Sequence, residues 1–132
     1  ISQAYEFIHR LEKKYSADLV EGGTNFSGGQ RQRLAIARAI IDKPEIYIFD
    51  DSFSALDFKT DAKVRRLLSE ETTDALTFIV AQRVSSIINA DQIIVLNEGE
   101  IVDIGTHQEL LQNSELYQEI ARTQLSEEEL YG

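Results

Sequence analysis

One stretch of this sequence, Asn25–Leu34, limits the possible folds more than any other. Ser27 and Gln30 have the spacing of a capping box, in which a serine caps the start of a helix and a glutamine three residues later caps in return. Gly28 and Gly29 leave the first turn bare, so a ligand can approach its N–H groups. A helix N-terminus carries about half a positive charge and favours anions, most often phosphate. An ordinary capped surface helix would show the same pattern, so the residues that follow must decide between an anion site and a surface helix.

The following residues predict a helix and then a strand that ends in two carboxylates. The helix must stop before Pro44, because the residue that precedes a proline is disfavoured in the α region. Ile46–Asp50 is apolar and β-prone, which is typical of a buried parallel strand, and Asp51 follows it. The carboxyl ends of such strands face the ligand crevice of an open α/β sheet. Two acids at that place are costly to bury unless they meet a metal ion or a proton donor.

Together these segments resemble the ATP-binding cassette (ABC) ATPases. Ser27–Gln30 matches the signature motif of that family, Ile46–Asp50 its Walker B strand and Ser54–Asp57 its D-loop. The three motifs occur in the family's order and spacing, and the resemblance extends over essentially all 132 residues. It implies an α/β fold, namely the C-terminal part of a P-loop NTPase domain. This part would contain a mostly parallel sheet with flanking helices, plus part of the helical subdomain.

The resemblance also implies a division of the chain. Residues 1–43 would form part of the helical subdomain, with Val20–Gly23 resembling the exporter X-loop that touches the coupling helices of the membrane domain. Residues 44–132 would form the C-terminal part of the ATPase core, with Walker B strand, D-loop, switch region and closing helices. The sequence contains no G-x-x-x-x-G-K-[ST] loop and begins at Ile1 without an initiator Met. We therefore expect the Walker A half to lie upstream in a longer chain.

Hydrophobic periodicity and turn residues predict the other elements. They are a helix with Ala4, Ile8, Leu11 and Tyr15 on one face, a loop at 18–25, a helix at 59–71, a strand at 77–81, a short helix at 84–89, a hairpin of 92–96 and 100–104 around the turn at 97–99, and helices at 107–111 and 115–124. The acidic run Glu127–Glu129 predicts a solvated tail.

In the family's fold, the Walker A strand lies between the strands expected at 77–80 and 93–96. Without it, two strand edges face a gap, and unpaired edges invite pairing with another chain. Apolar side chains that would lose cover are Ile48, Phe78, Ile79, Ile94 and Val95. We expect the missing half to be supplied by a longer chain; an isolated piece would rearrange or exchange strands. By itself this piece should not turn over ATP.

The resemblance assigns ATP and Mg²⁺ as cofactors and places two acids beside them. Asp50 corresponds to the Walker B aspartate that helps to hold the magnesium, a hard cation that prefers oxygen ligands. Asp51 stands where the family usually has the glutamate that polarises the attacking water. Its side chain is one methylene shorter, and a displacement of about 1 Å can cost about a hundredfold in rate. Asp51 is therefore a candidate catalytic residue with impaired reach.

A second departure from the family is Gln82, in a segment that resembles the exporter switch region, where histidine is usual. A glutamine amide can donate a hydrogen bond to a γ-phosphate, but it carries no charge and cannot shuttle a proton. Two departures in one composite site predict a site that hydrolyses ATP slowly or not at all. The signature residues Ser27–Gln30 are intact and would complete the site of a partner subunit. The pattern resembles the degenerate half of a heterodimeric exporter of the multidrug or lipid type.

Asp57 would lie at the interface with a second nucleotide-binding domain, where it could couple the two ATP sites. It could equally cap the following helix, and both roles are compatible. The resemblance places the domain at the cytoplasmic face of the membrane, attached through a transmembrane domain outside this sequence. The net charge of −10 makes nucleic acid an unlikely partner. Two alternatives stay open: a soluble ABC ATPase of the repair or translation type, and a non-catalytic module that uses ATP only as a clamp.

Overall fold

A computed structural model describes residues 1–126, and the predicted tail at Glu127–Glu129 lies outside the described residues. The chain divides into two compact units, Ile1–Val80 and the residues from Ala81 onward. Within the described part, no helix has both the length and the apolar character needed to cross a bilayer.

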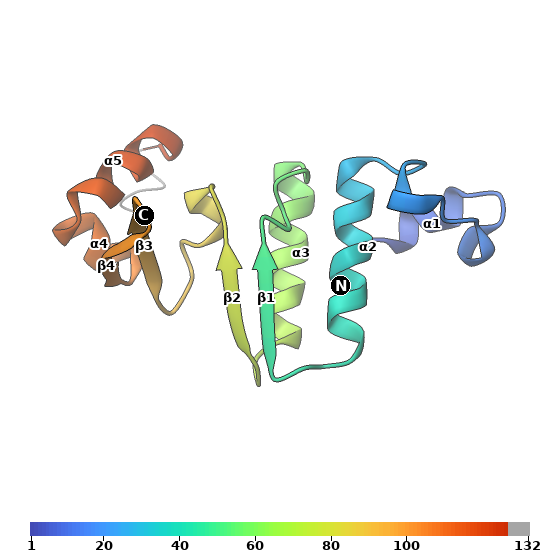
Figure 1. The fold of residues 1–132 in the computed structure, drawn as a ribbon, viewed down its shortest axis with the longest axis horizontal. Helices are drawn as coiled ribbons and strands as arrows, with labels where there is room; N and C mark the ends of the chain where they lie inside the picture. The colour runs from blue at the N-terminus through green and yellow to red at the C-terminus, as the bar shows by residue number, and fades with distance from the viewer. Residues whose placement is uncertain (127–132) are drawn as a thin grey trace. The chain divides into compact units, whose positions relative to one another are not determined.

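The first unit contains a parallel β–α–β arrangement preceded by helices (Figure 1). Its helices are α1 (Tyr5–Arg10), α2 (Gly28–Ile41) and α3 (Phe58–Glu71), and its strands are β1 (Ile46–Asp50) and β2 (Leu76–Val80). Single 3-10 turns occur at Lys14–Ser16 and Glu21–Gly23. The strands are parallel and in register, with Ile46 opposite Leu76 and Asp50 opposite Val80. The predicted helix at 59–71 and the predicted strand at 77–81 are thus each confirmed to within one residue at either end.

The core of this unit lies between one face of the sheet and the helices α2 and α3. Tyr47 and Phe49 alternate onto that face from β1, where they meet Ile36 of α2 and Val64 and Leu68 of α3. All five are at least 95% buried. Apolar burial contributes about 25 cal/mol per Å², so this cluster is what holds the end of β1 against the two helices.

The opposite face of the same sheet is open. Ile46, Ile48, Phe78 and Val80 are between 46% and 72% exposed, because alternation along a strand sends every second side chain to that face. The expectation that Ile48 and Phe78 lack cover is therefore confirmed. It is wrong for Ile79, which lies on the other face and packs against the core. The predicted burial of the Walker B strand likewise holds for one face only among the described residues.

The first helix is shorter than its periodicity predicts. It ends at Arg10, and Leu11 is already extended, with φ −73° and ψ 142°. The buried side chain is Phe7, whose ring contacts Phe26 edge to face, whereas Tyr15 is 70% exposed. The prediction was wrong in extent: Tyr15, at the far end of the expected apolar face, contacts the His9 ring edge to face but stays largely exposed. A short helix is marginal without packing against a core.

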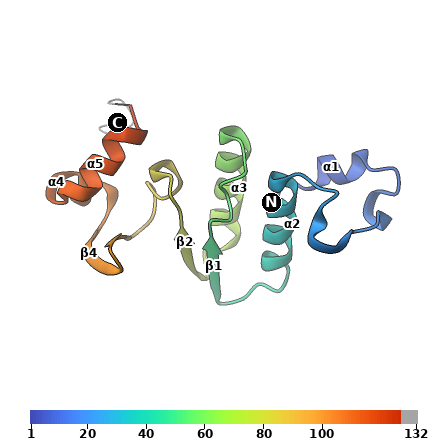
Figure 2. The ribbon, with the colours of Figure 1, turned by 45° about the horizontal axis from the view of Figure 1, so that its top comes forward.

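The second unit is a β-hairpin covered by two helices (Figure 2). Its elements are β3 (Ile93–Asn97), β4 (Glu100–Gly105), α4 (His107–Asn113) and α5 (Glu115–Gln124), preceded by a 3-10 turn at Val84–Ser86. The hairpin turn has Glu98 and Gly99 at positive φ, 50° and 85°, as a two-residue type I′ turn requires. These elements confirm the predicted hairpin and closing helices.

The core of the second unit contradicts the expectation that Val95 would be exposed. Ile93 and Val95 of β3 pack against Leu110 of α4 and against Tyr117 and Ala121 of α5. Val95 is only 5% exposed, so the expectation that it would lose cover is wrong. That expectation placed consecutive residues on one face, although a strand places them on opposite faces.

The α/β fold class is confirmed: the described residues combine helices with one parallel and one antiparallel strand pair. Within the described residues, β2 pairs with β1 alone and β3 with β4 alone. Each strand pair therefore keeps an outer edge on which a further strand could be added. The subdomain boundary predicted at residue 43 concerns a longer domain and stays a prediction.

Candidate functional site

The predicted capping box is present at the start of α2. The backbone N–H of Ser27 donates to Oε1 of Gln30 at 2.9 Å, and the Ser27 hydroxyl accepts from the Gln30 N–H at 3.2 Å. Ser27 is extended, with φ −64° and ψ 160°, so that its chain turns directly into the helix. The first turn of any helix has N–H groups without intrahelical acceptors. Ser27 caps the Gln30 N–H, and the two glycines between them carry no side chain that could cover their own N–H groups.

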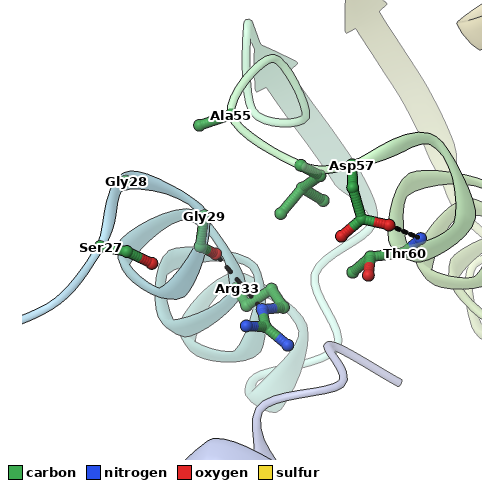
Figure 3. Close-up of a pocket in the computed structure, with 8 residues that line it drawn as sticks. Ser27, Gly28, Gly29, Arg33, Ala55, Asp57 and Thr60 are labelled. Atoms are coloured by element: carbon green, nitrogen blue, oxygen red, sulfur yellow. Dashed lines mark hydrogen bonds between the residues drawn. The ribbon is translucent and has the colours of Figure 1, made fainter.

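A pocket of about 300 Å³ opens at this helix end (Figure 3). One side is the first turn of α2 and the other is the segment between β1 and α3. Its lining residues are Ser27, Gly28, Gly29, Arg33, Ala55, Leu56, Asp57 and Thr60. Four predicted binding residues thus come together: Ser27, both glycines and Asp57. Gln30, the fifth, acts as the capping partner of Ser27.

Asp57 is the N-cap of α3. Its Oδ1 accepts from the Thr60 N–H at 3.0 Å, which confirms the capping role. Hydrogen bonds from the backbone and side chain of Thr60 hold the pKa of the Asp57 carboxyl below its ordinary value. Asp57 is therefore a carboxylate at neutral pH on the wall of the pocket opposite the α2 N-terminus. Its place at a subunit interface stays a prediction.

Gly29 is needed by the fold of this chain itself. A Cβ built on Gly29 would lie 2.8 Å from the backbone oxygen of Ala55, closer than such atoms approach in proteins. A Cβ on Gly28 would lie 3.3 Å from the Ala55 methyl group. The glycines were predicted to leave room for a ligand; they also let Ala55 lie directly against the first turn of α2.

Asp50 and Asp51 lie at the carboxyl end of β1, as predicted, and both are exposed. Asp51 has a left-handed backbone, with φ 48°, and its N–H donates to the Val80 oxygen at 3.1 Å. Its carboxylate Oδ2 accepts from the Ser54 hydroxyl at 2.9 Å. The candidate base is thus held within its own turn, while Asp50 presents an exposed carboxylate beside it.

Asp50 and Asp51 suit magnesium only as part of a ligand set that also includes water and phosphate oxygens. In the described part of the chain, no three His, Cys, Asp or Glu side chains converge to hold a metal ion on their own. Mg²⁺ commonly keeps several waters and takes one or two carboxylates together with substrate phosphates. The exposed Asp50 carboxylate at a strand end fits that limited role. Bound there, the ion would neutralise phosphate charge.

Gln82, the predicted switch residue, is the second residue of the second unit and is exposed. Gln124, the last residue of α5, binds the backbone on both sides of Arg83. Its Nε2 donates to the Gln82 oxygen at 2.9 Å, and its Oε1 accepts from the Val84 N–H at 2.8 Å. Sequence reasoning missed Gln124, because nothing in a helix-end glutamine indicates a contact with a segment about forty residues earlier.

We expect Gln124→Ala to loosen this segment. A backbone hydrogen bond contributes about 0.5–1.5 kcal/mol, so the Val84 amide should exchange with deuterium about 2- to 10-fold faster. Hydrogen–deuterium exchange measures this directly. Gln112→Ala, which removes an exposed glutamine from α4, is the matched control and should leave Val84 unchanged. Equal exchange at Val84 in both variants would show that α5 does not hold the segment.

The predicted X-loop segment contacts α2. Residues Glu21–Gly23 form a 3-10 turn with Gly22 and Gly23 at positive φ, 72° and 62°. The Arg31 side chain reaches back from α2 to the Gly22 oxygen at 3.4 Å. Val20 is 52% exposed at the start of this turn. The turn thus offers an exposed apolar side chain on a backbone that is hydrogen-bonded to α2.

The sequence did not lead us to two residues that line the pocket, Arg33 and Thr60. The guanidinium of Arg33 donates to the Gly29 oxygen at 3.3 Å and to the Gln3 oxygen at 2.9 Å, and it stacks over the Phe7 ring at 4.8 Å. Arg33 therefore joins the N-terminal segment to the first turn of α2. Helical spacing from Gly29 could have indicated its place one turn into α2. Thr60 could have been found as the third residue after a predicted cap.

Comparison with known proteins agrees with this geometry. The sequence matches the ABC transporter family over residues 2–54. An ABC transporter ATP-binding protein of Mycobacterium tuberculosis is 55% identical over 106 residues, which are 80% of this chain and 18% of that protein. The leukotoxin translocation ATP-binding protein LktB of Mannheimia haemolytica is 42% identical over 127 residues, 96% of this chain and 18% of LktB.

A solved structure of a bacterial Atm1-family ABC exporter with ATP bound matches with a TM-score of 0.90 and 35% identity. The match covers 96% of this chain and 22% of that one. The chain thus spans about a fifth of the length of the proteins that it matches. The capped α2 N-terminus, the Ala55 turn against it and the acids at the end of β1 agree with these matches. The chain belongs to the ABC transporter family and has the fold of the corresponding part of an ABC exporter's nucleotide-binding domain.

Proposed function

We propose that this chain is the signature and Walker B part of an ATPase domain that couples ATP binding and hydrolysis to transmembrane export. The domain would work at the cytoplasmic face of the membrane, attached to a transmembrane domain. Exporters among the matched proteins favour this assignment, because they match nearly the whole chain. The observation that carries it is the pocket between the α2 N-terminus and the D-loop.

That pocket has the electrostatics of half a phosphate site. The α2 N-terminus supplies oriented N–H groups and about half a positive charge. The phosphate-wrapping loop and its lysine, which the sequence does not contain, would come from the opposite subunit. Ser27–Gln30 would therefore close over the ATP held by a second nucleotide-binding domain. Asp57, an ionised carboxylate on the pocket wall, would lie at that interface.

The domain's own ATP site would be impaired. Asp51 is one methylene shorter than the usual glutamate, so its carboxylate would fall short of the attacking water. Gln82 can donate to a phosphate but cannot take up a proton. A subunit with an intact signature and an impaired own site belongs with a partner that has the opposite arrangement, a heterodimer. Val20–Gly23 would contact the coupling helices of the membrane domain.

A second candidate is a non-catalytic ATP clamp, and the shorter Asp51 together with the uncharged Gln82 favours it for this subunit's own site. In that case ATP would bind and stay. The third possibility, a soluble ABC ATPase of the repair or translation type, is disfavoured by the exporter relatives and by the net charge of −10, which repels a nucleic acid backbone.

The test uses the full-length protein with its partner, reconstituted in lipid vesicles. We expect Mg²⁺-dependent ATP hydrolysis and ATP-driven movement of a substrate across the membrane. Asp50→Asn should weaken the magnesium dependence at this subunit's site, whereas Asp91→Asn, a change at another exposed aspartate, should not. Nucleotide that is bound but never hydrolysed at this site would favour the clamp. Hydrolysis stimulated by nucleic acid and independent of the vesicles would contradict the export proposal.

A further inference from the structure

Gln32, one turn into α2, uses its whole amide group to hold the turn after β1. Its Nε2 donates to the Asp51 oxygen at 2.9 Å and to the Ser54 hydroxyl at 3.1 Å, and its Oε1 accepts from the Ala55 N–H at 2.9 Å. Three contacts from one side chain span residues 51–55. The proposed site uses Ser27–Gln30 on the same helix but assigns nothing to Gln32.

The contact to Ser54 continues to the candidate base. The Ser54 hydroxyl accepts from Gln32 and donates to Asp51, with Oδ2 at 2.9 Å and the backbone oxygen at 3.1 Å. The Ser54 oxygen accepts from the Gln32 N–H, so the single proton of the hydroxyl points away from Gln32 and toward Asp51. The orientation of the Asp51 carboxylate thus depends on a side chain of the signature helix.

The Asp51 backbone needs such support. A non-glycine residue at φ 48° lies in a sparsely populated region and persists where its surroundings hold it there. The Val80 oxygen accepts from the Asp51 N–H, and the Asp51 oxygen accepts from Gln32. The single Ser54 hydroxyl proton lies within reach of both this oxygen and the Asp51 carboxylate. Removing Gln32 would take away one of the groups that fix this peptide.

A second, independent contact joins the same two segments. Gly29 packs so closely on Ala55 that a methyl group at Gly29 would meet the Ala55 oxygen at 2.8 Å. The first turn of α2 therefore contacts Ala55 twice, through the bare Gly29 backbone and through the Gln32 amide. A shift of the helix start would therefore move the turn 51–55 as well, because Gly29 is already in close contact with Ala55.

We infer that Gln32 is a positioning residue: it fixes the Asp51–Ala55 turn, and through Ser54 the Asp51 carboxylate, relative to the N-terminus of α2. The inference rests on the proposed function for the meaning of Asp51, and it adds a regulatory consequence. A nucleotide that binds at the N-terminus of α2, in the partner's site, would therefore shift the Asp51 carboxylate of this subunit's own site.

The test compares Gln32→Ala with Gln32→Glu in the full-length complex without nucleotide. In Gln32→Ala we expect the Ala55 amide to exchange about 2- to 10-fold faster, because its acceptor is gone. Glutamate keeps an acceptor oxygen for Ala55 but loses both donated bonds, so Ala55 should stay slow in Gln32→Glu. A general loss of packing would affect both variants alike. Gln108→Ala, at an exposed glutamine of α4, is the matched control.

The second readout is ATP turnover at the Asp51 site, measured with the partner's site silenced. Both Gln32 variants should lower kcat about tenfold or more, since small misplacements of a catalytic group are costly. KM should stay within about twofold, because the Gln32 amide contacts Asp51, Ser54 and Ala55 and would not contact the nucleotide itself. Ser54→Ala should lower kcat similarly, and combining it with Gln32→Ala should add little, because the two act in one chain of bonds.

Unchanged Ala55 exchange in Gln32→Ala would overturn the inference, and so would faster exchange with unchanged kcat. A parent complex that hydrolyses no ATP at all would instead contradict the proposed function. The exchange comparison would then decide the role of Gln32 alone, because it needs no nucleotide.

Discussion

Ser27→Arg is expected to reduce ATP hydrolysis at the partner's site by about a hundredfold or more. The change removes the hydroxyl that accepts from the Gln30 N–H and so breaks the capping box. It also puts a long cationic side chain into the pocket at the α2 N-terminus. Preorganised donors of this kind contribute about 10²–10³ in rate each, and here several would be displaced together.

The measurement is turnover at the partner's site in the full-length pair, with this subunit's own site silenced. Ser69→Arg is the matched control, because Ser69 is exposed on α3 and its hydroxyl bonds only within its own helix, to the Arg66 oxygen. That variant should hydrolyse ATP at the parent rate. Parent-like turnover in Ser27→Arg would mean that the α2 N-terminus does not face the nucleotide.

Asp51→Glu combined with Gln82→His should raise hydrolysis at this subunit's own site, by about a hundredfold. The longer carboxylate regains reach toward the attacking water, and a shift of about 1 Å at a reacting group is worth about that factor. The imidazole regains a donor that can also carry charge. One cost is expected in return: glutamate tolerates the left-handed backbone at this position less well than aspartate does.

Single-site turnover with the partner's site silenced measures the gain, with each single change as a reference. Asp91→Glu, at an exposed aspartate outside the candidate site, is the control for the added methylene and should change nothing. Flat turnover in the double variant would contradict the interpretation of Asp51 and Gln82 as impaired substitutes. This subunit's own site would then hold ATP without hydrolysis because of residues other than Asp51 and Gln82.

The local elements and their order could be read from the sequence. The capping box at Ser27, the end of α2 before Pro44, the strand ending at Asp50 and the Glu98–Gly99 hairpin turn all occur as predicted. Each depends on residues within a few positions of one another, and caps, prolines and turn glycines act over that range. The family was identified for the same reason, because its motifs are short and contiguous.

Only the tertiary structure decided which segments support the site. Gln32 holds the turn after β1 and Gln124 holds the backbone at 82–84, although neither glutamine differs in sequence from an ordinary helix residue. The end of α1 at Arg10 and the burial of Val95 also depend on what lies opposite them. A side chain's partner is set by the packing of distant segments, and period and propensity carry no information about that packing.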